Sequence, residues 1–248
     1  DTEPKQVFRR GVAGGRPYNL LAVAKGAGMI RPDMATMLCF VCTDAWVPAA
    51  ALDRSLRRAV DVSFYRISID GDTSTNDTVI LMANGSSGAH LASPEDEQGF
   101  AALLEDALLE LARWIVCDGE GVNKTVEVCV RGARTAAEAL QVAETIAHSP
   151  LVKTAFFGQD ANWGRILAAA GRAGVPLDPD RLALFFDDVQ MVAEGVGCGS
   201  AAEARATAVL KQPAFSITLD LNQGAEAARI LTCDFSLDYV RINADYRT

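Results

Sequence analysis

The chain has 248 residues, of which 50% are hydrophobic and 22% are charged, and its formal net charge at pH 7 is −9. A chain of this length forms a globular core in at most two domains, and its negative charge argues against nucleic acid or an anionic membrane surface as a partner. It contains neither a run of roughly eighteen apolar residues nor a signal-peptide pattern, so we expect a cytoplasmic protein.

Apolar runs and amphipathic stretches alternate along the chain. Short apolar runs between turn residues predict strands, and apolar residues at helical spacing behind a capping residue predict helices. In chain order we expect strands at 20–24, 36–44, 64–69 and 79–83, with helices at 48–60 and 93–116 between and after them. The second half is expected to hold a strand at 124–130, helices at 135–149 and 162–171, and strands at 182–189, 214–221 and 230–235, with a last strand ending near 243. This order predicts an α/β fold, with mixed sheets packed with helices and a domain boundary near residue 150.

The histidines and cysteines give little support for metal or triad chemistry. The two histidines, His90 and His148, are far apart in sequence. Cys39 and Cys42 form a C-x-x-C pair, but no second pair follows at the spacing of a zinc site. We therefore expect no metal, and we expect Cys39 and Cys42 to be buried thiols in a reducing compartment.

The rest of the chain is organised around the stretch from Lys25 to Leu38. Gly26 and Gly28 can adopt a positive φ, and Pro32 fixes its own φ and favours an extended residue before it. An apolar, β-prone run begins at Thr36. The pattern therefore predicts a loop that presents the Thr36 hydroxyl where a core strand begins.

A threonine hydroxyl is a weak nucleophile unless a base lies beside it. Cleavage of the chain just before Thr36 would make its own α-amine that base, and an α-amine has a pKa of roughly 7.7–8. The alternative is that Thr36 is only a β-branched residue at the start of a strand. Taken alone, Thr36 favours this alternative, but the resemblance of the residues around it, given next, favours the nucleophile.

The residues from Gly28 to Leu38 resemble the self-cleavage motif of the ornithine acetyltransferase family, the glutamate N-acetyltransferases of arginine biosynthesis. Further segments resemble the same family in the same order, namely Asp70–Thr78, Asp118–Lys124, Asp160–Leu167 and Tyr239–Thr248. The resemblance implies the architecture of the self-processing aminopeptidase-like and ornithine acetyltransferase-like proteins.

The resemblance also implies a reaction. The chain would cleave itself between Ala35 and Thr36, and Thr36 would then carry acetyl from N2-acetyl-L-ornithine to L-glutamate by a ping-pong route. No cofactor is implied, and the sequence leaves open whether acetyl-CoA serves as a second acetyl donor.

Residues 1–35 would be the tail of an α-subunit segment, and 36–150 and 151–248 would be two parts of the β-subunit. The family suggests an α2β2 heterotetramer and places the oxyanion-hole donors in the upstream segment, so residues 1–248 alone are expected to be inactive.

Four residues are candidates for substrate binding beside Thr36. Glu120 lies between two glycines on a loop, where its carboxylate can orient a substrate ammonium or move protons, although a solvated turn is the simpler alternative. The resemblance assigns substrate contacts to Lys25, Asn243 and Thr248, with Lys25 on a carboxylate.

Other polar residues are given structural roles or are left open. Lys124 and the Asp70–Asp77 loop are expected to support the site, and the loop does not fit a calcium-binding EF-hand, which needs Gly and Glu where Thr75 and Leu81 stand. The helix start at Asn162–Arg165 could bind a carboxylate or could simply pack.

Asp33 departs from the asparagine that is usual before Met-Ala-Thr, and its charge could slow cleavage. Two alternative functions also remain: a self-cleaving aminopeptidase or amidase of the same superfamily, and a non-catalytic relative.

Overall fold

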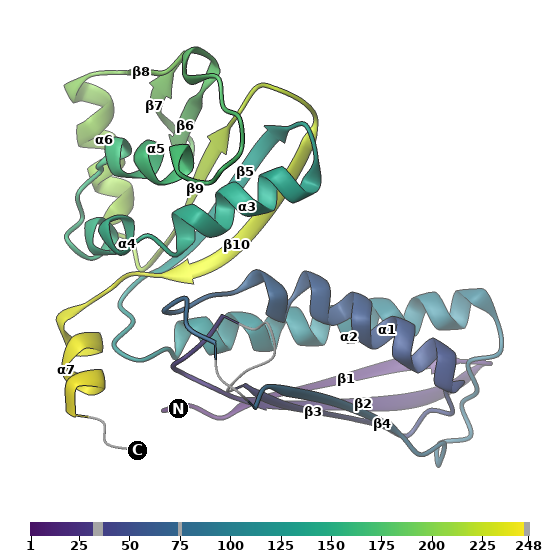
Figure 1. Ribbon diagram of the computed structural model, residues 1–248. Coiled ribbons are helices and arrows are strands. Elements are labelled where there is room, and N and C mark those ends of the chain that lie inside the picture. The colour runs from purple at the N-terminus through teal and green to yellow at the C-terminus, as the bar shows by residue number, and fades with distance from the viewer. Residues whose placement is uncertain (32–36, 74–75, 246–248) are drawn as a thin grey trace. The chain divides into compact units, whose positions relative to one another are not determined.

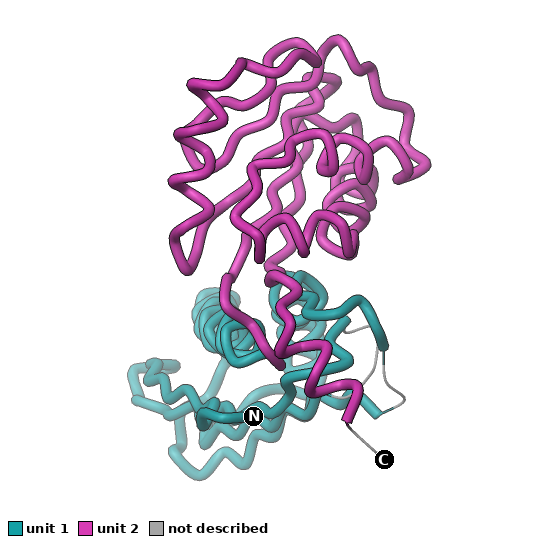
Figure 2. Tube along the Cα trace, turned by 90° about the vertical axis from the view of Figure 1, so that its left-hand side faces the viewer, with its two compact units in different colours: residues 1–119 teal, residues 120–248 magenta. Residues whose placement is uncertain are grey.

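The computed structural model describes residues 1–31, 37–73 and 76–245. Their contacts divide the chain into two compact units, Asp1–Gly119 and Glu120–Thr248, which are coloured separately in Figure 2. Each unit is described by itself below. Both combine sheets with helices, as expected of an α/β fold.

The first unit is built on a sheet with the strand order β1-β2-β3-β4. The strands are β1 (Lys5–Ala13), β2 (Arg16–Lys25), β3 (Leu38–Thr43) and β4 (Thr78–Ala83). Strand β2 pairs antiparallel with both β1 and β3, and β3 pairs in parallel with the edge strand β4. Helices α1 (Ala49–Val62) and α2 (Pro94–Cys117) lie on one side of this sheet (Figure 1).

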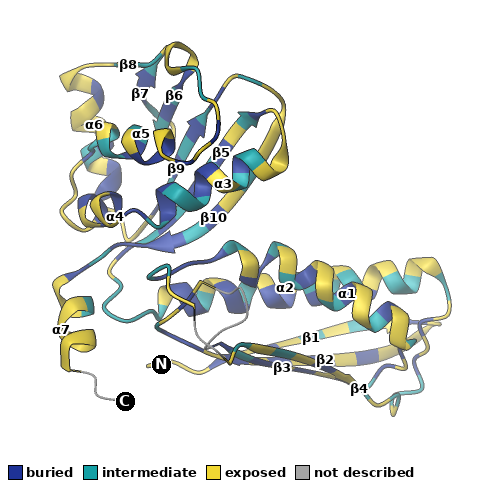
Figure 3. Cartoon of the chain, viewed as in Figure 1, coloured by how far each residue is buried: buried dark blue, intermediate teal, exposed yellow. Residues whose placement is uncertain are grey.

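The two faces of the first sheet differ in burial, because successive residues of a strand point to opposite faces. On the helix side, Leu20, Ala22, Cys39 and Val41 are completely buried. On the other side large apolar residues are exposed. Buried and exposed residues therefore alternate along the strands in Figure 3. We call this second side the open sheet face; its exposed apolar residues are Phe8, Val12, Leu21, Val23, Phe40, Ile80 and Met82.

The second unit has a sheet with the strand order β10-β5-β9-β6-β7-β8. Its elements are β5 (Thr125–Ala133), α3 (Ala136–Ala147), α4 (Pro150–Phe157), α5 (Trp163–Gly171), β6 (Ala183–Phe186), β7 (Val189–Ala193), β8 (Val196–Gly197), α6 (Ser200–Leu210), β9 (Ala214–Asp220), β10 (Glu226–Cys233) and α7 (Leu237–Asp245). Strands β5 and β9 are parallel and the other pairs are antiparallel, so the sheet is mixed.

The boundary expected near residue 150 falls inside the second unit. Ile146 and Val152, on either side of it, are completely buried in the same hydrophobic core. Pro150 begins the helix α4 directly after α3, because proline is tolerated in the first turn of a helix. The division between the compact units lies instead between Gly119 and Glu120.

Two predicted strands are wrong. The segment expected as a strand at 64–69 contains a short 3₁₀ helix at Phe64–Arg66. The last segment is the helix α7 (Leu237–Asp245), because the Ser236 hydroxyl accepts a hydrogen bond from the Tyr239 amide and caps it. The sequence reading also missed the helices α4 and α6.

The prediction for the C-x-x-C pair is half right. Cys39 is buried and burial raises its pKa to about 12, whereas Cys42 is exposed on the open sheet face. Residues three apart in a strand point to opposite faces, so the two thiols cannot share a metal ion. Among the described residues, no cluster of His, Cys, Asp and Glu is arranged to hold a metal, and no helix is long and apolar enough to cross a membrane.

Candidate functional site

The Asp70 carboxylate holds the loop that leads toward Thr36. It accepts hydrogen bonds from the backbone amides of Met29 at 2.7 Å and Ile30 at 3.0 Å. The backbone reinforces this contact, because the Ile69 amide donates to the Ile30 carbonyl at 2.8 Å. Met29 has a φ of 50°, a conformation that L-residues rarely adopt and that these bonds help to maintain.

Asp77 holds the other side of the same stretch. Its carboxylate accepts a hydrogen bond from the Met37 amide, and the Thr78 amide donates to the Met37 carbonyl at 2.9 Å. The two ends of the Asp70–Thr78 loop therefore fix the backbone on both sides of residues 32–36. This is the supporting role that the sequence predicts for the loop. Ala35 and Thr36 themselves, like Asp33, lie outside the described residues.

Lys25 is the last residue of β2 and its side chain is exposed. In the antiparallel pairing of β2 with β3 it lies opposite Leu38, which follows Thr36 by two positions in the sequence. The next residue, Gly26, has a φ of 149°, and an added Cβ there would lie 3.0 Å from Ile30 Cδ1. The chain thus leaves β2 in a conformation that suits glycine and turns directly toward the loop held by Asp70.

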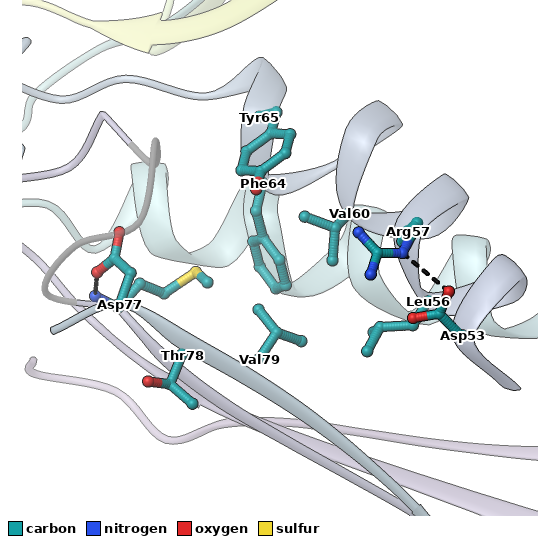
Figure 4. Close-up of a pocket in the computed structure, with 10 residues that line it drawn as sticks. Asp53, Leu56, Arg57, Val60, Phe64, Tyr65, Asp77, Thr78 and Val79 are labelled. Carbon is teal, nitrogen blue, oxygen red and sulfur yellow. Dashed lines mark hydrogen bonds and ion pairs between the residues drawn. The ribbon is translucent and has the colours of Figure 1, made fainter. Parts of the chain in front are cut away.

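A cavity of about 570 Å³ adjoins Met37 in the first unit. Figure 4 shows it between α1 and the edge strand β4. Its lining is mainly apolar, with Met37, Leu56, Val60, Phe64 and Val79 among the residues that form it. Its volume is in the range of small-molecule sites.

The charged residues in the cavity wall are already paired. Arg57 donates to Asp53 at 2.9 Å, and this hydrogen bond lowers the pKa of the Asp53 carboxyl. One oxygen of Asp77 accepts from the Met37 amide. The cavity therefore suits an apolar group better than a free carboxylate or ammonium.

The second unit brings together two of the predicted substrate-binding residues, Glu120 and Asn243. The Asn243 side-chain amide donates to Glu120 Oε2 at 3.1 Å and to the Tyr239 carbonyl at 3.0 Å. Glu120 precedes the strand β5 and Asn243 lies on α7, so the contact joins residues that are far apart in the sequence. Thr248, the third residue predicted near the end of the chain, lies outside the described residues.

The chemistry of this pair follows from how its atoms are used. Both hydrogens of the Asn243 amide are donated, which leaves the amide oxygen as an acceptor beside the Glu120 carboxylate. Two adjacent acceptors, one of them charged, are suited to a substrate ammonium. The orienting role expected for Glu120 stays a prediction.

Lys124 and the Asn162–Arg165 segment have structural contacts. Lys124 is buried, and its ammonium donates to the Gln212 carbonyl at 3.3 Å. The Asn162 side chain accepts from the Arg165 amide at 3.2 Å and so caps its own helix, while Arg165 donates to the Leu151 carbonyl at 2.9 Å. The packing alternative is favoured for this helix start.

Comparison with known proteins agrees with these motifs. The model of the ArgJ family matches residues 1–248. The chain is 57% identical over 250 residues to the arginine biosynthesis bifunctional protein ArgJ of Geobacter sulfurreducens, a match that covers 100% of this chain and 64% of the relative. It is 52% identical to the protein of the same name from Syntrophotalea carbinolica, covering 98% of this chain and 62% of that one. The chain thus spans less than two thirds of the length of these relatives.

A solved structure is similar as well. The crystal structure of the arginine biosynthesis bifunctional protein argJ from Bacillus halodurans matches with a TM-score of 0.80 and 40% sequence identity. The match covers 85% of this chain and 100% of the solved chain.

Proposed function

The chain belongs to the ArgJ family, and on that premise we propose that it forms the nucleophile-bearing part of a glutamate N-acetyltransferase. The enzyme would transfer acetyl from N2-acetyl-L-ornithine to L-glutamate through an acetyl-Thr36 intermediate. The observation that carries this proposal is the family match over the whole chain, which includes the stretch from Lys25 to Leu38. The hydrogen bonds that fix both sides of that stretch support it.

The first step is self-cleavage. The Thr36 hydroxyl attacks the Ala35 carbonyl, and the peptide bond to the Thr36 nitrogen breaks, which frees the Thr36 α-amine. Water then hydrolyses the resulting ester and releases the Ala35 carboxylate and the Thr36 hydroxyl. Asp70 and Asp77 contribute by holding the backbone before and after the bond that breaks.

The second step is acetyl transfer. The free α-amine takes the proton of the Thr36 hydroxyl, which attacks the acetyl carbonyl of N-acetylornithine and releases ornithine. Glutamate then takes the acetyl group from Thr36. Glu120 and Asn243 would receive the substrate ammonium, and Lys25 would receive a carboxylate.

A direct test of this function is the trapped intermediate. The complete gene product, incubated with N-acetylornithine in the absence of glutamate, should carry one acetyl group on the peptide that begins at Thr36. Addition of glutamate should remove it and yield N-acetylglutamate. Rapid loss of the acetyl group to water without glutamate would favour the amidase alternative, and absence of acetylation in a folded protein would favour the non-catalytic relative.

We also propose that the open sheet face binds an upstream segment of the same precursor, the α-subunit segment of an α2β2 enzyme. The relatives are longer than this chain, which spans 64% of the Geobacter protein. Four neighbouring strands expose large apolar side chains on this one face, and an apolar patch of this kind marks an interaction surface. An apolar partner face would bury these side chains.

Cys42 offers a natural probe of this surface. In the complete protein, the Cys42 thiol should be protected from alkylation, while Cys198, which is exposed in the second unit, should react. A photo-crosslinking amino acid at Phe40, on the same face, should link to peptides from the upstream segment. Rapid alkylation of Cys42, or crosslinks only to a second copy of this chain, would contradict the proposal.

The proposal also includes the second acetyl donor and the cellular compartment. The relatives are named bifunctional, and for this chain we infer acetyl-CoA as the second acetyl donor. No cofactor is proposed, because the acyl transfer uses the hydroxyl and the α-amine of Thr36. A cytoplasmic location belongs to the same proposal and follows from a role in amino-acid biosynthesis.

A further inference from the structure

A buried serine links the two segments that carry Glu120 and Asn243. Ser236 is 4% exposed, and its hydroxyl donates to the Gly121 carbonyl at 2.6 Å. The same oxygen accepts from the Tyr239 amide at 3.1 Å, where it caps the first turn of α7. One hydroxyl thus connects the residue after Glu120 to the helix that carries Asn243.

Neighbouring contacts fix the chain on both sides of this hydroxyl. The buried Asp234 carboxylate accepts from the backbone amides of Asn123 and Lys124, each at 2.9 Å, and so holds the loop that follows Glu120. The Phe235 ring stacks on Tyr239 with centroids 4.8 Å apart. The segment before α7 is therefore fastened to the Glu120 loop at several points.

The fit around Gly121 is close enough to require glycine. Gly121 has a φ of 67°, and an added Cβ would lie 2.3 Å from the Tyr239 nitrogen and 2.8 Å from Ser236 Oγ. The loop backbone thus packs directly against the first turn of α7. Asn243, later on the same helix, donates to Glu120 at 3.1 Å.

We propose that Ser236 is a positioning residue that sets the geometry of the Glu120–Asn243 pair for substrate binding. This inference rests on the proposed function, because that function assigns the substrate ammonium to Glu120 and Asn243. Ser236 itself has no contact with the substrate. Loss of the hydroxyl leaves the Gly121 carbonyl without its donor and α7 without its cap. The Glu120 carboxylate and the Asn243 amide then lose their fixed separation, which weakens binding of the substrate ammonium.

The test compares Ser236→Ala, Ser236→Thr and a matched control in the complete gene product. The control is Ser149→Ala, because Ser149 is also a buried N-cap serine of this unit, but its hydroxyl makes no capping hydrogen bond in the described part of the chain. Denaturing mass spectrometry first checks that each variant cleaves itself. Steady-state kinetics then give KM for N-acetylornithine and kcat.

We expect Ser236→Ala to raise KM by about tenfold with kcat within about twofold, the pattern of lost ground-state binding. Ser236→Thr, which keeps a hydroxyl, should return KM to within about threefold of the wild type. Ser149→Ala should leave both constants unchanged. A Ser236→Ala variant that matches Ser149→Ala, or one that loses kcat at constant KM, would overturn the proposal.

Hydrogen exchange separates this inference from the proposed function. In Ser236→Ala, the Tyr239 amide and the first turn of α7 should exchange faster, while the amides of β5 should keep wild-type protection. If the wild type transferred no acetyl group, the function would fail, but this exchange pattern would still support the link between Ser236, Gly121 and α7. Unchanged exchange at Tyr239 would refute the link itself.

Discussion

At the scale of single residues, Asp70 supports the stretch that leads toward Thr36. Its carboxylate accepts two amide hydrogen bonds, from Met29 and Ile30, and hydrogen bonds to a charged acceptor contribute about 1.5–3 kcal/mol each. Asp70→Ala should therefore lower the free energy of unfolding by a few kcal/mol and slow self-cleavage by at least roughly tenfold.

Asp72 provides the control for Asp70, because it is an exposed aspartate of the same loop. Asp72→Ala should keep the wild-type unfolding curve and the wild-type rate of fragment appearance, both followed on freshly made precursor. Equal behaviour of the two variants would mean that the carboxylate of Asp70 does not hold the loop.

Gly121 yields a second prediction at this scale. Alanine at a φ of 67° is strained, and its Cβ would collide with the Tyr239 nitrogen. Gly121→Ala should lower the free energy of unfolding by about 2 kcal/mol or more, measured by urea titration. Gly171→Ala is the matched control, because that helical glycine has open space around it, and it should be neutral or slightly stabilising. Similar losses in both variants would contradict the close packing at Gly121.

At the scale of elements, an ion pair ties β1 to the C-terminal end of α2. Burial acts to raise the pKa of Asp118, but hydrogen bonds from Lys5 and Thr2 outweigh it and lower the pKa from 3.8 to about 2. Lys5 is itself buried, so the pair is shielded from solvent. A lowered carboxyl pKa stabilises the fold above the unfolded-state value, and this stability is lost as the pH falls through the folded-state value.

The pair predicts a specific pH dependence. The wild type should lose up to about 2 kcal/mol of stability through this group between about pH 4 and pH 2. Asp118→Asn cannot titrate, so its free energy of unfolding should fall less steeply over the same range. Urea unfolding at several pH values measures the difference, and parallel curves for the two proteins would refute the assignment.

The sequence predicts elements well where the signal is local. The helix predicted to begin at residue 93 is α2, and Ser93 caps it and exchanges hydrogen bonds with Asp96. The prediction from sequence is wrong for 64–69 and for α7, where β-branched and aromatic residues are typical of a strand. A 3₁₀ turn forms in the first segment, and a serine cap begins a helix in the second. Serine is a preferred N-cap residue, so Ser236 is the sequence signal that could have predicted the start of α7.

At the scale of the whole molecule, the resemblance predicts the site residues but not the contacts that hold them in place. The contact between Glu120 and Asn243 joins residues at opposite ends of the second unit's sequence, so no local pattern predicts it. The same is true of the cavity beside Met37, whose walls come from α1 and β4. The open sheet face, in contrast, follows from strand alternation once the strands are placed.

The predicted site residues are divided between the two units. The first unit carries Lys25 and the stretch that contains Thr36, and the second carries Glu120 and Asn243. Under the proposed function, self-cleavage should depend on the contacts that hold the Thr36 stretch in the first unit. Substrate affinity should depend strongly on Glu120 and Asn243 in the second unit. The central claim is that Thr36 is the nucleophile in both steps.

The most direct measurement is the denaturing intact mass of the complete gene product beside its Thr36→Ala variant. The account predicts two fragments divided between Ala35 and Thr36 in the wild type and a single uncleaved chain in the variant. A single uncleaved chain in a well-folded wild type, or the same two fragments in Thr36→Ala, would contradict it.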